Sequence, residues 1–179
     1  MKQKISQIKL GLPTEETCQM GCLVNQKQFQ KVMNYIESGK QEGAKLLCGG
    51  VKPEGEKFQA GNFLLPTLFV DVLPSMRIAR EEIFGPVVSV MSWDQEEAML
   101  GHVNELEFGL TTSIWSNNIN HALRAAGRIE AGYIWINHVG SHFLSAPYGG
   151  QKNSGLGSTG CLDELLNYLQ FKNVHISIL

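Results

Sequence analysis

The order of apolar and polar segments between residues 87 and 137 places the strongest constraint on the fold of this 179-residue chain. Short apolar runs typical of buried strands occur at 87–92, 111–116 and 133–137, and segments with helical spacing separate them. Strands that alternate with helices through short connections favour parallel pairing and right-handed crossovers. The sequence therefore predicts an α/β fold with a mainly parallel sheet and flanking helices.

The loop after the third strand is the expected location of binding residues. Ligands of open parallel sheets meet the carboxyl ends of the strands and the loops beyond them. Asn137 ends the third strand, and the loop 138–155 that follows combines aromatic, histidine and glycine residues.

Two capping boxes predict helix starts, at Asn25 with Gln28 and at Asp94 with Glu97. The first helix is expected to end near Gly43. Its buried face comprises Phe29, Val32, Met33 and Ile36. The second helix buries Met99, Val103 and Leu106, and a third, ended by Gly132, buries Ile119, Ala122, Leu123, Ala126 and Ile129.

Two further strands are expected in the first half of the chain, at 45–48 and 63–70. Pro66 lacks a backbone N–H, so it favours an edge position or a break in the second of these strands.

The C-terminal segment contains a helix and an alternating tail. The helix carries Leu162, Leu165, Leu166 and Leu169 on one face, and Cys161 falls on the same apolar face. Residues 172–178 alternate apolar and polar side chains, which predicts a half-buried strand. Such a strand pairs either with another subunit, as an oligomerisation strand, or within this chain, and both alternatives remain open.

Composition argues against several classes of partner. The net charge of −2 shows no basic excess of the kind that nucleic acid or anionic membrane requires. No apolar run approaches the roughly 20 residues that span a bilayer, and the first residues lack the apolar core of a signal peptide. We expect a cytoplasmic protein with no nucleic acid and no membrane partner.

The cysteines and histidines give weak metal signals. Four cysteines in a chain of this size do not suggest a disulfide framework. Cys18 and Cys22 have no second pair at zinc spacing, and His138 and His142 occur in a loop rather than on a helix. We therefore expect no metal site.

Residues 155–160 match G-x-G-x-x-G, the fingerprint of dinucleotide-binding folds. That fingerprint follows a buried strand, opens a helix and precedes an acidic residue by about 20 positions. Here a polar loop, 150–154, precedes it, and the chain ends before a βαβ unit is complete. We reject this interpretation.

Residues 81–87, Glu-Glu-Ile-Phe-Gly-Pro-Val, place two carboxylates and a phenyl ring before a Gly-Pro corner. A carboxylate accepts two hydrogen bonds from a diol, and an aromatic face can hold a flat heterocycle. The Gly-Pro corner presents both at the entrance of a strand. A simple turn between two elements fits the same pattern.

Together with residues 147–157, this segment resembles the NAD(P)-dependent aldehyde dehydrogenase superfamily. Residues 81–87 look like that family's cofactor signature, and Pro-Tyr-Gly-Gly-Gln-Lys-Asn-Ser-Gly-Leu-Gly looks like its P-[FWY]-G-G-x-K-x-S-G-x-G segment. Stretches at 17–21, 36–39 and 43–45 resemble earlier family motifs in the right order. The resemblance implies that residues 1–179 form the C-terminal part of the catalytic domain, an incomplete fold of that type.

The resemblance also implies roles for five residues. Glu82 matches the carboxylate that binds the hydroxyls of the nicotinamide ribose, and Phe84 matches the ring that packs near the nicotinamide. His142, Phe143 and Tyr148 fall on or near positions that line the aldehyde tunnel, although ordinary core packing explains Phe143 and Tyr148 equally well. The implied cofactor is NAD or NADP, with weak or no binding by this chain alone.

The family's reaction needs a cysteine thiolate, in a G-Q-x-C context, and a glutamate base. The cysteines of this chain, all outside that context, are Cys18, Cys22, Cys48 and Cys161. The base, an oxyanion asparagine and the dinucleotide-binding domain would precede residue 1. Ser158 also follows Gly157 where the family has arginine. We expect no catalytic residue here and no activity of the isolated chain.

Three functions fit these observations. The chain belongs to an enzyme that oxidises a small aldehyde to an acid, acting as a homo-oligomer or with a complementing chain; or it is a non-catalytic remnant or assembly module. A related acyl-phosphate or semialdehyde reductase would have the same architecture.

Overall fold

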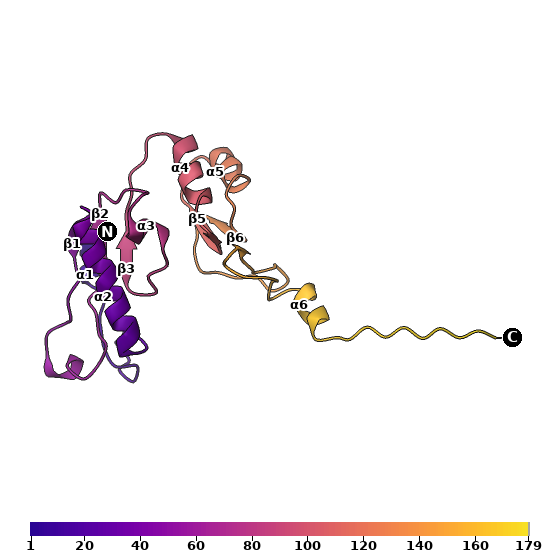
Figure 1. The fold of residues 1–179 in the computed structure, drawn as a ribbon, viewed down its shortest axis with the longest axis horizontal. Helices are drawn as coiled ribbons and strands as arrows, with labels where there is room; N and C mark the ends of the chain where they lie inside the picture. Colours follow the sequence, from indigo (N-terminus) through magenta and orange to yellow (C-terminus); the bar gives the residue numbers. More distant parts are fainter. Residues whose placement is uncertain (179) are drawn as a thin grey trace. The chain divides into compact units, whose positions relative to one another are not determined.

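The computed structural model describes residues 1–178. The chain divides into two compact units, the N-terminal unit Met1–Asp94 and the C-terminal unit Gln95–Leu179. Each unit contains both helices and small sheets (Figure 1). The predicted α/β class is therefore confirmed.

The N-terminal unit contains one three-stranded sheet in the order β1-β2-β3. Strand β2 lies in the centre, antiparallel to β1 and parallel to β3, with Thr67 opposite Val87. The elements of this unit are α1 (Lys2–Ser6), α2 (Gln26–Gln41), β1 (Lys45–Cys48), the 3-10 helix η1 (Glu56–Phe58), β2 (Thr67–Val70), α3 (Arg77–Arg80) and β3 (Val87–Ser89).

Helix α2 begins and ends where the sequence predicts. The Asn25 side chain accepts a hydrogen bond from the backbone N–H of Gln28 at 2.8 Å and so caps the first turn. The helix ends at Gln41, and Gly43 follows with φ +95°, a left-handed conformation that glycine adopts without strain.

The core of the N-terminal unit forms where α2 packs on the sheet and on α3. Val32, Ile36 and Phe69 are fully buried. Gly39 allows this close approach, because a Cβ atom there would lie 2.8 Å from Ile78 Cδ1 and 3.3 Å from Phe69 Cζ. The core residues are Phe29, Val32, Tyr35, Ile36, Ala44, Leu64, Phe69, Val72, Met76, Ile78 and Ile83.

Pro66 does not place its strand at the edge of the sheet. Strand β2 begins at Thr67, directly after the proline, and is the central strand of its sheet. Because Pro66 lies outside the strand, every residue of β2 keeps the N–H that pairing requires. The break was predicted correctly and the edge position was wrong.

The C-terminal unit contains two two-stranded sheets. Strands β5 and β6 are parallel, with Thr111 opposite Tyr133, and β4 pairs with β7 antiparallel. The elements are α4 (Glu96–Asn104), β4 (Phe108–Gly109), β5 (Thr111–Ile114), α5 (Ile119–Ala126), β6 (Tyr133–Ile136), β7 (Gln151–Lys152) and α6 (Leu162–Asn167).

The expected strands at 87–92, 111–116 and 133–137 do not share one sheet. The second and third pair as predicted, β5 with β6, but β3 pairs with β2. Strand β2 supplies β3 with a parallel partner earlier in the chain, a pairing that the sequence pattern did not predict.

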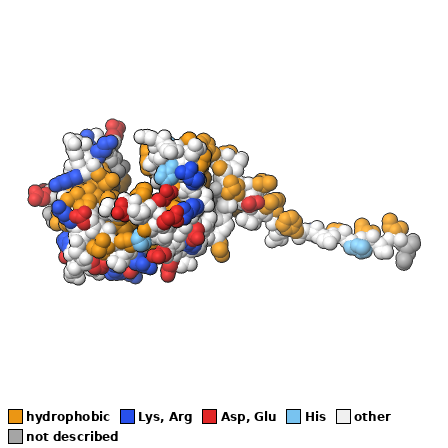
Figure 2. All heavy atoms as spheres, turned by 90° about the horizontal axis from the view of Figure 1, so that it is seen from above, with side chains coloured by type: hydrophobic (Ala, Val, Ile, Leu, Met, Phe, Trp, Pro, Cys, Tyr) orange, Lys and Arg blue, Asp and Glu red, His pale blue; other side chains and the backbone are white. Residues whose placement is uncertain are grey.

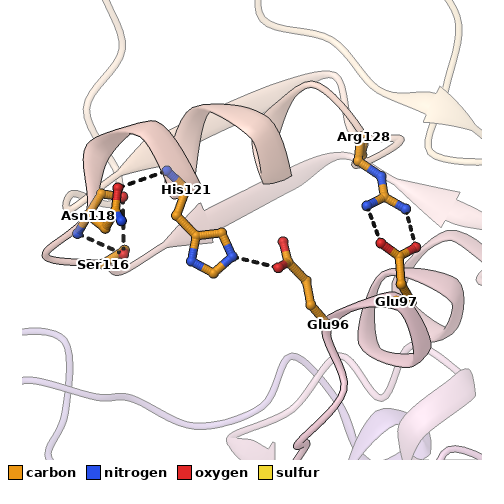
Figure 3. A network of polar contacts seen from close by, with 6 residues as sticks. All are labelled: Glu96, Glu97, Ser116, Asn118, His121 and Arg128. Carbon is orange, nitrogen blue, oxygen red and sulfur yellow. Dashed lines mark hydrogen bonds and ion pairs between the residues drawn. The ribbon is translucent and has the colours of Figure 1, made fainter.

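Helices α4 and α5 are joined by two polar contacts (Figure 3). His121 Nε2 lies 2.6 Å from Glu96 Oε2, and the Arg128 guanidinium, just after α5, forms a bidentate pair with the Glu97 carboxylate. The Asn118 side chain caps α5 by accepting a hydrogen bond from the N–H of His121.

The predicted capping box of α4 is wrong. The N-cap is Gln95 rather than Asp94, and its side chain makes no capping hydrogen bond. The Glu97 carboxylate is directed to Arg128 instead of back to the helix start. A bidentate pair with arginine competes effectively with a single backbone contact.

The predicted apolar faces of the C-terminal unit are only partly buried. Leu100 is the buried residue of α4, and Ala122 and Ala125 are those of α5. Ile119 and Leu123 are more than half exposed. Helix α5 ends at Ala126, earlier than the predicted Gly132.

Helix α6 and the tail expose their apolar side chains. Cys161 is the N-cap of α6 rather than part of an apolar face. Residues 172–178 form no strand within the described chain, and hydrophobic side chains are spaced along this segment (Figure 2). Pairing within the chain is thus not observed, and the oligomerisation strand stays a prediction. The exposed residues are Leu162, Leu165, Leu166, Leu169, Val174, Ile176 and Ile178.

Candidate functional site

Residues 81–87 connect the end of α3 to β3, and two of their side chains anchor the segment. Ile83 is buried in the core. The Glu81 carboxylate accepts a hydrogen bond from Tyr35 Oη at 2.8 Å and pairs with Arg77 Nε through both oxygens, at 3.1 and 3.0 Å. The first carboxylate of the motif therefore has intramolecular partners.

These partners stabilise the charged form of Glu81. The hydrogen bond from the Tyr35 hydroxyl has the largest effect and lowers the pKa of the Glu81 carboxyl. The Arg77 guanidinium lowers this pKa further, whereas burial opposes both effects. Burial has the largest effect on Tyr35 and raises its pKa, and the adjacent Glu81 carboxylate raises it further. The Arg77 guanidinium also lies 4.3 Å from the centre of the Tyr35 ring, so the three groups form one structural network.

Glu82 differs from its neighbour. Its side chain is exposed, and within residues 1–178 it makes no hydrogen bond or ion pair. A free carboxylate beside a fixed one retains its full capacity to accept hydrogen bonds from a ligand. The sequence alone did not distinguish the two glutamates by their surroundings, and the structure does.

Phe84 presents its ring to solvent from an unusual backbone conformation. Its φ is +54°, and 69% of the residue is exposed. A bulky side chain rarely adopts a left-handed conformation, and such outliers cluster at functional sites. Lys31 Nζ, on α2, lies 5.8 Å from the ring centre.

Gly85 brings the segment into direct contact with α2. A Cβ atom at this position would lie 2.6 and 2.8 Å from the two methyl carbons of Val32, which is fully buried. The glycine of the motif is therefore required by packing. The Pro86 carbonyl then accepts a hydrogen bond from the N–H of Thr67 at 2.8 Å, which leads the chain into β3.

In the C-terminal unit, Asn137 fixes the ends of the two parallel strands. Its φ is +54°, and its side chain accepts a hydrogen bond from the Ser116 N–H at 2.8 Å and donates one to the Ser116 carbonyl at 2.9 Å. Both polar atoms of its amide group are occupied, so Asn137 starts the following loop as a structural anchor.

His142 and Tyr148 are brought together in a ring cluster, defined by Tyr133, Trp135, His142 and Tyr148. The His142 and Tyr148 ring centres are 4.3 Å apart, and His142 contacts Tyr133 and Trp135 at 5.5 and 5.7 Å. Edge-to-face packing of this kind orients the loop after β6. Phe143, in contrast, is 69% exposed and lies outside the cluster.

A groove of about 420 Å³ lies next to this cluster. Tyr148 contributes to its wall, together with residues 154–159 and α6. Tyr148 also exchanges backbone hydrogen bonds with Thr159 at 2.8 and 3.0 Å, so the two ends of the loop lie side by side. The G-x-G-x-x-G run at 155–160 follows the exposed two-residue strand β7, which is not the setting of a dinucleotide fingerprint.

Sequence reasoning missed three residues that shape the 81–87 segment: Gln28, Tyr35 and Arg77. Gln28 was interpreted as half of a capping box, but its side-chain Nε2 donates to the carbonyls of Ile83 and Phe84, both at 2.9 Å. Tyr35 carries the only local signal, because a tyrosine on a buried helix face needs a partner for its hydroxyl.

Two wider features concern metals and membranes. Among residues 1–178, no three histidine, cysteine or acidic side chains come together as a metal site would require. Over the same part of the chain, no helix is long and apolar enough to cross a membrane.

Known proteins match nearly the whole chain. Residues 1–174 match the aldehyde dehydrogenase family. The chain is 44% identical over 171 residues to aldehyde dehydrogenase tropH of Talaromyces stipitatus, covering 94% of this chain and 33% of that protein. It is 42% identical over 176 residues to a betaine aldehyde dehydrogenase of Brucella anthropi, covering 98% of this chain and 36% of that protein.

Solved structures agree with these matches. The crystal structure of betaine aldehyde dehydrogenase from Staphylococcus aureus in complex with NAD+ superposes with a TM-score of 0.88 and 33% identity, covering 93% of this chain and 33% of that one. The chain spans about a third of the length of the curated relatives it matches. With a family match over residues 1–174, this chain belongs to the aldehyde dehydrogenase family.

Proposed function

We propose that this chain supplies cofactor-binding and substrate-binding residues to an enzyme that oxidises an aldehyde to a carboxylic acid with NAD or NADP. The observation that supports this most directly is the contrast between Glu81 and Glu82. One carboxylate is committed to Tyr35 and Arg77, and the other is exposed and has no hydrogen-bond or ion-pair partner among residues 1–178.

The surroundings of Glu82 and Phe84 fit the nicotinamide end of such a cofactor. The Glu82 carboxylate can accept both hydroxyl hydrogens of a ribose, and the outward Phe84 ring offers an apolar face to a flat nicotinamide. The bound nicotinamide would supply the hydride-accepting chemistry. The role of this chain's residues is to hold and orient that group.

The proposed substrate contribution comes from the loop after β6. His142 and Tyr148 are fixed in the ring cluster, while Phe143 is free to contact an apolar substrate group. We infer that these three residues line the aldehyde pocket of the enzyme. The substrate class is a small aldehyde.

A titration of the 179-residue chain with NAD+, followed by ligand-observed NMR because that method detects the weak binding expected of this chain, tests the cofactor assignment. Glu82→Gln removes the charge that receives the ribose hydroxyls and should weaken binding by about tenfold. Phe84→Ala should weaken it by about fivefold. Glu54→Gln is the matched control, because Glu54 is also an exposed glutamate of the same unit. Equal affinities for Glu82→Gln, Glu54→Gln and the unchanged chain would refute the assignment.

Assembly through the tail is a second candidate role. Residues 172–178 expose Val174, Ile176 and Ile178 in alternation and form no strand within the described chain. An unpaired segment of this pattern can add a strand to another subunit. The mass of the chain in solution, compared with that of an Ile176→Lys variant, tests this role. Identical masses at all concentrations would exclude it.

A further inference from the structure

Gln28, in the first turn of α2, directly holds the backbone of residues 81–87, the proposed cofactor segment. Its Nε2 donates hydrogen bonds to the consecutive carbonyls of Ile83 and Phe84, each at 2.9 Å. One amide group bound to two successive carbonyls restrains the peptide between them, and therefore the backbone of Phe84.

The Phe84 backbone needs such a restraint. Its φ of +54° lies in a region that bulky residues occupy only when the surrounding structure holds them there. The phenyl ring cannot provide that support, because 69% of the residue is exposed. Within residues 1–178, no other hydrogen bond reaches the carbonyls of Ile83 and Phe84.

The neighbouring anchors act on either side of this position. Upstream, Glu81 is fixed by Tyr35 and Arg77. Downstream, Gly85 packs against Val32. Glu82 and Phe84 lie between these two anchors, where Gln28 is the side chain that holds the backbone.

We propose that Gln28 is a positioning residue that sets the directions of the Glu82 carboxylate and the Phe84 ring, and thereby the affinity for a nicotinamide nucleotide. This inference rests on the proposed function. Both carbonyl contacts use the Gln28 amide nitrogen, and we assign the effect of Gln28 on the nucleotide to the segment that these contacts hold.

The test uses Gln28→Glu in the 179-residue chain. Glutamate has the same shape but no donor hydrogens at neutral pH, and it is a favourable residue near a helix N-terminus. Helix α2 should therefore keep its stability while the two carbonyl contacts are lost. Gln30→Glu is the matched control, because Gln30 is exposed on the same helix, its side chain donates to Asn34 on that helix, and the variant acquires the same added charge.

Two measurements separate positioning from general stability. In the ¹⁵N-labelled chain, the coupling between the amide and α hydrogens of Phe84 reports φ. We expect it to change in Gln28→Glu and not in Gln30→Glu, and urea unfolding shows that both variants are folded under the conditions of the measurement. NAD+ affinity should fall by about tenfold in Gln28→Glu and stay unchanged in Gln30→Glu. Gln28→Met, which removes the donors without adding charge, should reproduce both effects.

The outcomes are distinct. An unchanged Phe84 coupling in both Gln28 variants overturns the inference. Normal NAD+ affinity of both Gln28 variants also overturns it if Glu82→Gln binds NAD+ weakly. If Glu82→Gln and Phe84→Ala also bind NAD+ normally, the proposed function fails, and the role of Gln28 in nucleotide affinity fails with it. The coupling of Phe84 then still decides whether Gln28 holds the backbone.

Discussion

The two units differ in how they bury apolar side chains. In the N-terminal unit, large residues such as Ile36, Leu64 and Phe69 are fully enclosed. The buried hydrophobic residues within 95–178 are Leu100, Ala122, Ala125, Ala131 and Trp135, three of which are alanines. Because hydrophobic stabilisation scales with buried apolar area, the N-terminal unit has the stronger core of its own.

The same contrast applies to the two candidate binding segments. Residues 81–87 are anchored by the buried Ile83 and by hydrogen bonds from α2 and α3. The loop after β6 is held mainly by ring contacts of His142 and Tyr148, and it exposes Phe143 and Leu144. A segment anchored to a core is fixed before ligand binds, whereas an exposed loop can adapt its shape.

The largest expected effect compares isoleucine in the two units. Ile36→Ala removes a fully buried side chain, so it should lower the free energy of unfolding of the N-terminal unit by about 2–5 kcal/mol. Ile119→Ala removes a side chain that is 55% exposed, and alanine is a strong helix former. This substitution should change the free energy of unfolding of the C-terminal unit by no more than about 0.5 kcal/mol. Urea unfolding at neutral pH measures both. Similar losses would mean that the two units do not differ in core strength.

A pair of glycine substitutions should change stability in opposite directions. Gly85→Ala places a Cβ atom 2.6 Å from a Val32 methyl carbon, which should cost about 1–3 kcal/mol by overpacking. Gly101→Ala, inside α4, meets no atom within 4 Å and should stabilise its unit by about 0.5–1 kcal/mol. Thermal unfolding measures the sign of each change. A neutral Gly85→Ala would show that α2 and residues 81–87 can move apart without loss of stability.

The sequence predicted local elements better than it predicted pairing. Helix α2, strand β1 and the β5–β6 pair follow from spacing and capping residues, because these signals are local. The partner of β3 did not follow, because Pro66 was assigned to the strand that it only precedes. Pairing depends on contacts between distant residues, which periodicity does not report.

The sequence predicted which residues form the candidate site, but not which neighbouring residues hold them in place. The family motif named Glu82 and Phe84, but the chemistry of two adjacent glutamates is the same in sequence. Only the fold shows that Tyr35 and Arg77 bind the Glu81 carboxylate, while the Glu82 side chain has no such partner among residues 1–178. Gln28 was hidden for a similar reason, since a glutamine at that helical position has an ordinary role in capping.

A smaller effect tests the network that fixes Glu81. The folded state lowers the pKa of Glu81 below its unfolded value of about 4.3. Its contribution to stability is therefore present above that value and is lost as the pH falls through the folded pKa. Tyr35→Phe removes the hydrogen bond and should cost about 1 kcal/mol at pH 7.

The difference between Tyr35→Phe and the unchanged chain should shrink in acid, because a protonated Glu81 no longer has a charge for the tyrosine to stabilise. Urea unfolding at pH 7 and at about pH 3 measures this. Tyr133→Phe serves as the control in the other unit, where Tyr133 packs through its ring against Trp135, His142 and Tyr148. A loss that is independent of pH would assign Tyr35 a packing role only.

The smallest effect concerns the ion pair of the C-terminal unit. Arg128→Gln removes the bidentate pair with Glu97 that joins the end of α5 to α4. Both groups are largely exposed, so solvent and salt screen their attraction, and the loss should be smaller than that from Tyr35→Phe. Thermal unfolding at low salt and at 1 M salt measures it. Arg124→Gln, which changes an exposed arginine on α5 itself, is the control and should have no effect. Because the C-terminal unit has few large buried side chains, a loss from Arg128→Gln that rivals the loss from Tyr35→Phe would show that polar contacts, rather than apolar burial, hold α4 and α5 together.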